Sequence, residues 1–171
     1  LLLLFTGCSS KTSMIEIQKH VYVEKEFKDS WLETNEFGDS YIKEELQGGY
    51  HYHFDQQFLE IFFNTGGKIE LYNYSIKKND LIISGEMIPP KTIRLVHPHL
   101  DNVTSEGVII HELGHYFDEK HQFSSSKQFT KLYKKYRTLF NQKTKKEYFA
   151  ECFKEYVGCL LYTSPSPRDG A

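Results

Sequence analysis

Cysteine is scarce in this chain, and a disulfide-stabilised scaffold is not predicted. Only three of its 171 residues are cysteines. On a helix, Cys152 and Cys159 would be separated by about 10.5 Å of rise, which is too far for a disulfide bond. Beyond the first few residues, the sequence has no apolar run long enough to span a membrane. These two absences argue against a disulfide-rich fold and against a membrane-spanning one.

The overall charge is also weak, so it identifies no class of partner. The formal net charge is −2 and the sequence pI is about 6.5. Hydrophobic residues make up 39% of the chain and aromatic residues 15%. That content is sufficient for a folded core, and the length suits a single domain. We expect a monomer that does not bind nucleic acid.

One segment departs from this charge balance. Eight Lys and Arg residues and no Asp or Glu lie between Ser124 and Lys146. The simpler interpretation is a solvated helix face, which we favour. The alternative is a surface that contacts anionic lipid or cell-wall polymer.

The first residues are typical of a secretory signal. Leu1 to Phe5 is apolar and is followed by small residues. The run from Phe5 to Cys8 resembles the lipobox of bacterial lipoproteins, in which the cysteine becomes the lipid-bearing first mature residue. We therefore expect residues 1–7 to be a signal-peptide remnant and residues 8–15 a lipid-attached tether. An incidental cysteine in an ordinary signal peptide, or in a clipped strand, is the alternative.

The last residues do not fit the pattern before them. From Cys159 to Ala171 a helical pattern stops in a Ser/Pro tract that resembles translated sequencing-adaptor sequence. We interpret residues 159–171 as a non-native tail and exclude them. The predicted domain is then 16–158, and we expect the natural domain to continue beyond it.

Within this domain the pattern predicts helices, then a small sheet, then helices. Residues 16–46 and 55–65 have apolar residues at helical spacing. Short strands are expected at 68–74, 81–84 and 92–96. Further helices are predicted from about 105 to 118, from about 126 to 140, and from 144 onward. This order indicates an α+β fold.

The run His111-Glu112-Leu113-Gly114-His115 carries the chemistry. Residues four apart lie on one helix face, so His111 and His115 can bind one metal ion. Glu112 would lie beside the open metal position, where it can accept a proton from the attacking water. The preceding apolar turn indicates a buried helix. Gly114 disfavours a helix by about 1 kcal/mol, which suggests close approach of another backbone.

A catalytic zinc ion needs a third protein ligand. The downstream candidates are His121, Glu147, Glu151 and Glu155. Glu147 follows Thr144 by three residues, so we expect its carboxylate to cap the helix start. Asp118 is either a residue that orients a ligand histidine or a surface acid.

The two motifs resemble the catalytic domain of the anthrax lethal factor family, which includes the secreted Pro-Pro endopeptidases of Gram-positive bacteria. The likeness lies in the run from Val108 to Asp118 and in the run from Glu147 to Phe153, and it extends over about residues 50–158. It implies a zincin-like fold, in which a small sheet packs on the active-site helix and on a second, ligand-bearing helix. It also implies that Glu151 is the third zinc ligand.

The chain departs from that family at one position. The family has an active-site tyrosine one to two turns before the ligand glutamate. The corresponding region here holds Gln142, Lys143 and Thr144, and the nearest tyrosines are Tyr133, Tyr136 and Tyr148. A donor to the developing oxyanion is expected, but the sequence does not place it.

These observations predict a zinc-dependent endopeptidase, lipid-anchored at the outer face of a bacterial membrane. It would bind an extended peptide along an edge strand such as Ile93 to Val96. A preference for cutting next to proline is implied by the resemblance alone. The alternatives are a non-catalytic zinc-binding lipoprotein and a cell-wall amidase.

Overall fold

The structure, a computed structural model, describes residues 13–34, 38–49, 54–78, 81–97, 107–140 and 144–159. The elements run in order along the chain: β1 (Met14–Gln18), β2 (Val21–Glu24), η1 (Lys25–Phe27), α1 (Lys28–Leu32), α2 (Tyr41–Leu46), α3 (Gln57–Asn64), β3 (Lys68–Tyr72), β4 (Ile76–Lys78), β5 (Leu81–Ile83), β6 (Gly85–Ile88), β7 (Thr92–Val96), α4 (Val108–His121), η2 (Phe123–Ser125), α5 (Lys127–Tyr136) and α6 (Lys145–Cys159). In these ranges, the helices are all too short or too polar to cross a bilayer.

Five strands form the main sheet, in the order β1-β2-β3-β7-β6. Strands β2, β3 and β7 are parallel, and antiparallel hairpin strands flank them on both sides. Alternate residues of the three central strands point into the core and are fully buried: Val21, Val23, Ile69, Leu71, Ile93 and Leu95. This period of two is what a half-buried strand requires. The α+β prediction is confirmed.

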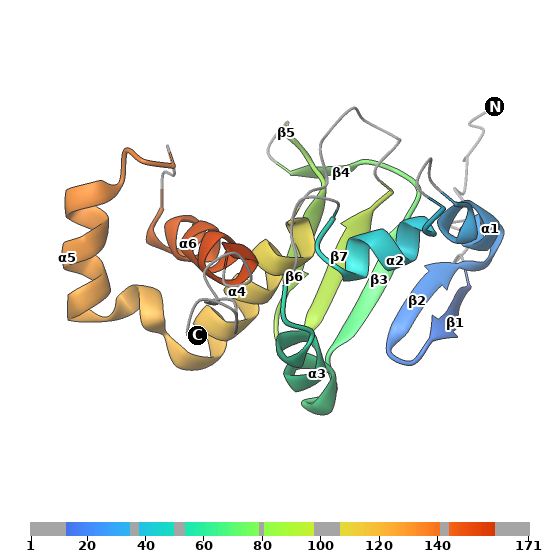
Figure 1. The fold of residues 1–171 in the computed structure, drawn as a ribbon, viewed down its shortest axis with the longest axis horizontal. Helices are drawn as coiled ribbons and strands as arrows, with labels where there is room; N and C mark the ends of the chain where they lie inside the picture. Colours follow the sequence, from blue (N-terminus) through green and yellow to red (C-terminus); the bar gives the residue numbers. More distant parts are fainter. Residues whose placement is uncertain are drawn as a thin grey trace, which may run out of the picture.

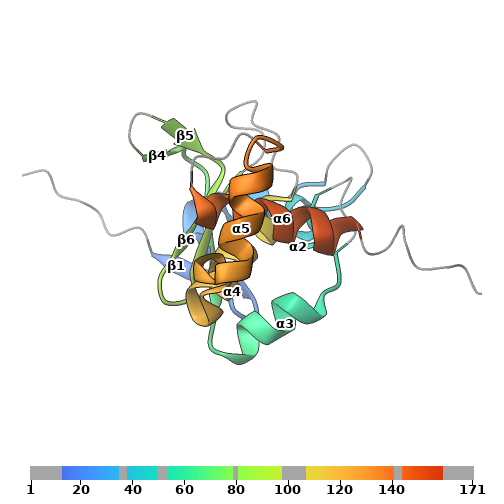
Figure 2. The same ribbon diagram turned by 90° about the vertical axis from the view of Figure 1, so that its left-hand side faces the viewer.

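Helix α4 packs against the β6 and β7 side of the sheet (Figure 1). Its residues Ile109, Ile110 and Leu113 are fully buried in the same core as the strand residues. Helix α6 lies along α4 on the side away from the sheet, and α5 stands at the far end of the molecule (Figures 1 and 2). The predicted motif helix is therefore a buried one.

The N-terminal hairpin corrects the sequence prediction. Residues from Glu16 were expected to be helical and residues up to 15 to be a tether, but β1 already begins at Met14. Ile15 to Gln18 alternates in burial, and β2 pairs in parallel with β3. The β3 partners lie 48 residues further along the chain, so the local pattern did not reveal this pairing. Strands β4 and β6 were also not predicted.

The helix starts predicted at Ser40, Asp55 and Ser126 are confirmed, because each depends only on neighbouring residues. The Ser40 and Ser126 side chains accept hydrogen bonds from Lys43 N–H and Phe129 N–H. Asp55 accepts from Gln57 N–H at 3.0 Å. These contacts satisfy amide donors that a helix start leaves open.

Ion pairs across three strands hold β6 at the sheet edge. Arg94 of β7 contacts Glu70 of β3 at 3.2 Å and Glu86 of β6 at 3.3 Å. Burial alone would raise the pKa of Glu70, but hydrogen bonds from Lys68, Tyr72 and Arg94 outweigh it and lower that pKa. The arginine thus links the edge strand to the centre of the sheet.

Helices α4 and α6 touch backbone to backbone at Gly114. A Cβ atom there would lie 2.9 Å from Ala150 Cα and 3.2 Å from Phe153 Cβ. The sequence prediction that another backbone approaches Gly114 is confirmed. The motif histidines lie on α4 and the candidate ligand glutamates lie on α6. This contact therefore sets the distance between the histidines and the glutamates.

Gly114→Ala should therefore destabilise the protein by roughly 1–3 kcal/mol. In a helix that made no such contact, the same change would stabilise by about 1 kcal/mol. Urea unfolding of parent and variant measures the difference. A stabilised variant would mean that α4 and α6 do not pack at this distance.

Candidate functional site

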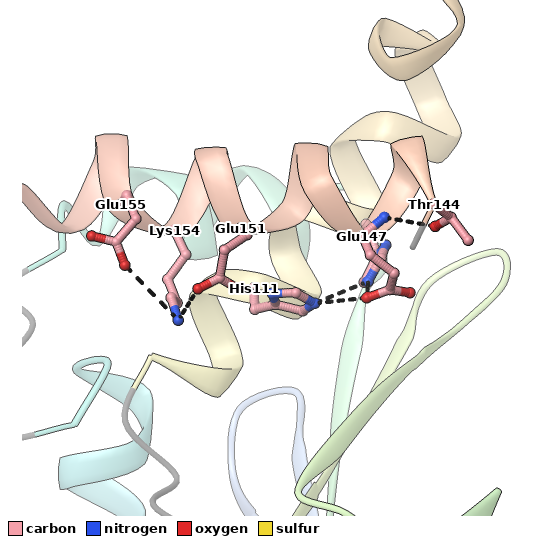
Figure 3. A network of polar contacts seen from close by, with 7 residues as sticks. His111, Thr144, Glu147, Glu151, Lys154 and Glu155 are labelled. Atoms are coloured by element: carbon pink, nitrogen blue, oxygen red, sulfur yellow. Dashed lines mark hydrogen bonds and ion pairs between the residues drawn. The ribbon is translucent and has the colours of Figure 1, made fainter. Parts of the chain in front are cut away.

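The two motif histidines lie one turn apart on α4. Figure 3 shows His111 facing α6, and His115 also contacts an α6 side chain, Glu147. Each histidine side chain is 18% exposed. Their rings are edge to face, with centroids 4.8 Å apart, and their Nε2 atoms are 3.2 Å apart. Two nitrogen lone pairs therefore converge on one point at the helix surface.

Glu147, from the first turn of α6, completes this group. One carboxylate oxygen, Oε2, lies 3.3 Å from His111 Nε2 and 3.4 Å from His115 Nε2. These three side chains can hold a metal ion.

The distances fit a tetrahedral metal site. With metal–ligand distances of about 2.0–2.1 Å, ligand atoms on a tetrahedron are about 3.3–3.4 Å apart. The three separations here are 3.2, 3.3 and 3.4 Å. Two imidazoles and a carboxylate are also a ligand set used by catalytic zinc, which leaves the fourth position open.

The structure places the carboxylates of Glu147 and Glu151 on different sides of the His111 ring. Glu147 was expected to cap α6, and Glu151 to be the third ligand. Thr144 Oγ1 does accept a hydrogen bond from Glu147 N–H at 3.2 Å, but the Glu147 carboxylate faces the histidines. Glu151 Oε2 instead lies 3.1 Å from His111 Nδ1, the ring nitrogen on the other side.

Lys154 holds Glu151 in this position. Its Nζ lies 2.6 Å from Glu151 Oε1, and both side chains are largely buried. A carboxylate on Nδ1 fixes the tautomer of a ligand histidine, so that Nε2 presents its lone pair. The two glutamates thus bracket the His111 ring from one face of α6 (Figure 3).

The surrounding charges favour a cation at this point. Burial alone would lower the pKa of His111, but its hydrogen bonds to Glu147 and Glu151 raise the pKa to about 9. Reciprocally, the hydrogen bond to His111 lowers the pKa of Glu151 to about 2. The pKa of Glu147 is also lowered, by its hydrogen bonds to His111 and His115. A proton or a metal ion is stabilised here by two carboxylates.

Glu112 is the buried carboxylate of the motif. Its residue is only 6% exposed, and burial raises its pKa although both histidines oppose that shift. The backbone of Met87 in β6 hydrogen-bonds to it. A carboxylate with a raised pKa is suited to accept and return a proton.

A cleft of about 740 Å³ opens over these residues. It is lined by β6 on one side and by α4 and α6 on the other; the lining includes Gly85, Met87, His111, Glu112, His115 and Glu147. This volume lies in the range of ligand sites.

Strand β6 is the sheet edge at this cleft, which corrects the prediction that Ile93 to Val96 is an edge strand. That segment is β7, which is paired on both sides by β3 and β6. Val96 N–H donates to Ser84 O. The alternation of antiparallel pairing then turns the backbone groups of Gly85 and Met87 away from β7, toward the open edge.

Asp118 has a local partner instead of orienting a histidine. Its two carboxylate oxygens accept hydrogen bonds from Ser124 N–H and Ser124 Oγ–H, both at 2.7 Å. It therefore fastens the turn after α4. The other ligand candidates also lie elsewhere: the His121 ring contacts the Phe123 ring, with centroids 5.2 Å apart, and Glu155 lies 4.0 Å from Lys154.

None of the described tyrosines lines the cleft. Tyr148 is buried and donates its hydroxyl to Tyr136 O at 3.0 Å, and Tyr133 packs on Tyr148. Thr144, Lys146 and Lys154 do line the cleft. Gln142, Lys143 and the predicted lipidation residue Cys8 lie outside the described residues.

The two glutamates can be told apart by zinc affinity. If Glu147 is the third ligand, Glu147→Ala should weaken zinc binding most, and Glu151→Ala should weaken it about 10–100-fold through loss of ring orientation. Glu155→Ala is the matched control and should bind like the parent. Competition with a chelator measures all three.

The opposite ranking would make Glu151 the ligand, as the resemblance implies. If both the Glu147 and the Glu151 variants bind zinc as tightly as the parent, neither carboxylate contributes to the metal site.

We compared the chain with protein-family models, with curated proteins and with solved structures, and none of the three comparisons gives a match. The likeness to the lethal factor family therefore rests on the two sequence motifs, now seen facing each other on α4 and α6.

Proposed function

We propose that this protein is a zinc-dependent endopeptidase with a zincin-like site, akin to the lethal factor family. One observation carries the proposal. The Nε2 atoms of His111 and His115 and a Glu147 oxygen are spaced as a tetrahedral metal site requires, next to a buried Glu112 and an open strand edge.

His111, His115 and a glutamate of α6 would hold the metal. When bound, zinc would polarise the scissile carbonyl and make a water molecule more acidic. The protein itself orients the metal ligand: Glu151 and Lys154 fix the His111 ring. The substrate would reach the site through the cleft.

Glu112 would move the proton. Its carboxylate takes a proton from the attacking water as the water oxygen bonds to the carbonyl carbon. When the carbon–nitrogen bond breaks, Glu112 returns that proton to the leaving amine. Its burial supports this role, because a raised pKa brings its proton affinity closer to that needed near neutral pH.

The substrate would be an extended peptide antiparallel to β6. The outward-facing backbone of Gly85 and the carbonyl of Met87 can pair with such a peptide, which would add a strand to the sheet, while the Met87 backbone N–H donates to Glu112. Figure 1 shows β6 beside α4. A peptide paired with the open edge of β6 would therefore lie close to the motif helix. Ile83, Pro89 and Val108 add apolar lining to the cleft, and the preference for cutting next to proline rests on the resemblance alone.

The alternative function, a non-catalytic zinc-binding protein, does not explain why Glu112 is a buried carboxylate. Burying a carboxylate is costly unless it is paired, and a structural metal site has no need of one beside its ligands. A cell-wall amidase shares the same metal chemistry, but the open strand edge supports an extended peptide.

Glu112→Gln should retain zinc and lose hydrolysis by several orders of magnitude, because the ligands remain while the proton acceptor is gone. Metal content and turnover on a peptide library are measured on the same preparation. Glu60→Gln, at an exposed acid of α3 that does not line the cleft, is the control and should remain active. A variant that keeps its turnover would contradict the assigned role of Glu112.

The same preparation should be incubated with purified peptidoglycan. Cleavage there, without cleavage of any library peptide, would favour the amidase. Zinc binding without either activity would favour the non-catalytic rival.

We further propose that the protein is anchored to the outer face of a bacterial membrane by lipid on Cys8. The sequence pattern from Leu1 to Cys8 supports this. An active site that cuts extended segments at that surface would act on secreted or surface proteins.

Cys8→Ser should release the protein into the medium of a bacterial host, because the thioether that attaches the lipid cannot form. Membrane and medium fractions are compared by immunoblot. Mass spectrometry that finds an unmodified Cys8 on the mature parent protein would refute the anchor.

A further inference from the structure

Helix α5 and the turn after it form a surface that the proposed peptidase function does not use. The segment from Ser124 to Lys146 contains eight Lys and Arg residues and no acidic residue. In Figure 2, α5 stands in front of the rest of the molecule, with α6 behind it. We call Lys131, Leu132, Lys135, Tyr136 and Leu139 the α5 flank.

One face of α5 packs inward and thereby leaves the α5 flank to solvent. Phe129 contacts Phe149 of α6 with ring centroids 5.4 Å apart, and Tyr133 contacts Tyr148 at 5.5 Å. Leu132 and Tyr136 lie to one side of this face and are 50% and 37% exposed, and Leu139 is 69% exposed. Two leucines therefore remain largely in water.

Positive charge lies next to these apolar side chains. Lys135 Nζ is 4.9 Å from the centre of the Tyr136 ring. Lys131 lies one helical turn before Lys135, so both point to the same side of α5. A face that only needs to be solvated gains nothing from exposed leucines, because exposed apolar area is unfavourable in water.

We propose that the α5 flank binds the surface of an anionic lipid bilayer. The lysines would contact lipid phosphates, while Leu132, Tyr136 and Leu139 would reach the boundary between headgroups and acyl chains. Tyrosine and lysine both suit this depth, because each has an apolar body and a polar end. A soluble polyanion could pair with the lysines, but it has no apolar region in which the leucines could be buried.

This surface would hold the protein in a defined orientation on a membrane, whether or not the metal site is catalytic. In the sequence, this surface corresponds to the basic run from Ser124 to Lys146. From the sequence alone, a solvated helix face is the simpler interpretation of that run. The packing of Phe129 and Tyr133 on α6 is the added fact, since it shows which apolar residues of α5 stay uncovered.

Vesicle flotation tests the proposal on the full chain, with Cys8→Ser in every protein so that no lipid anchor contributes. Vesicles of phosphatidylcholine alone are compared with vesicles that also contain phosphatidylglycerol. The parent should bind only the anionic vesicles, and salt should weaken the binding. Parent protein that does not bind anionic vesicles overturns the proposal.

The variants locate the binding surface. Lys131→Glu with Lys135→Glu should weaken binding at least about tenfold. Lys19→Glu with Lys28→Glu reverses the same number of charges on exposed residues near the β1–β2 hairpin and should bind like the parent. Equal losses in both pairs would mean that only the net charge matters, which overturns the proposal.

Leu132→Ser with Leu139→Ser tests the apolar part. It should weaken vesicle binding without changing the charge. Unchanged vesicle binding, together with tight binding of soluble polyphosphate by the parent, would identify the surface as a site for an anionic polymer and would overturn the lipid proposal. Thermal melts establish that each variant is folded, and because both leucines are exposed, these changes should leave the melting temperature near that of the parent.

Discussion

The backbone contact between α4 and α6 is the constraint on which the site depends. Gly114 leaves no room for a side chain against Ala150, so the two helices lie closer than ordinary side chains allow. Only at this separation do glutamates on α6 reach both sides of the His111 ring on α4. A glycine that weakens its own helix is thus explained by the position that it gives to residues on the neighbouring one.

A second close contact places the motif beside the sheet edge. A Cβ atom on Gly85 would lie 2.6 Å from Val108 Cγ1, at the first turn of α4. Strand β6 therefore runs directly past the start of the motif helix, and the Met87 backbone reaches Glu112. One strand therefore both forms the edge of the sheet and contacts the buried carboxylate of the motif through its backbone.

The charges of the molecule form an acidic group and a basic group, and Lys146 of the basic run also lines the cleft. The cleft gathers carboxylates around two imidazoles, an arrangement that favours a bound cation. Four of the eight basic residues from Ser124 onward, Lys127, Lys131, Lys134 and Lys135, lie on α5, whose inward face packs on α6 through aromatic rings. Helix α6 therefore has two functions in this fold: it presents acids to α4 on one side and supports the basic helix on the other.

The sequence by itself determined the features that depend on neighbouring residues. Helix starts at Ser40, Asp55, Ser126 and Thr144 follow from side chains that reach amides two or three residues away. The pairing of His111 with His115 follows from helical spacing, and the glycine within the motif indicated a close neighbour. Only the tertiary structure decided the rest. It made β6 the open edge and β7 an inner strand, and it added the β1–β2 hairpin, because strand partners are distant along the chain. It also placed Glu147 on the Nε2 side of the histidines and Glu151 on Nδ1: both acids lie on one face of α6, so helical spacing alone cannot tell which faces the metal position.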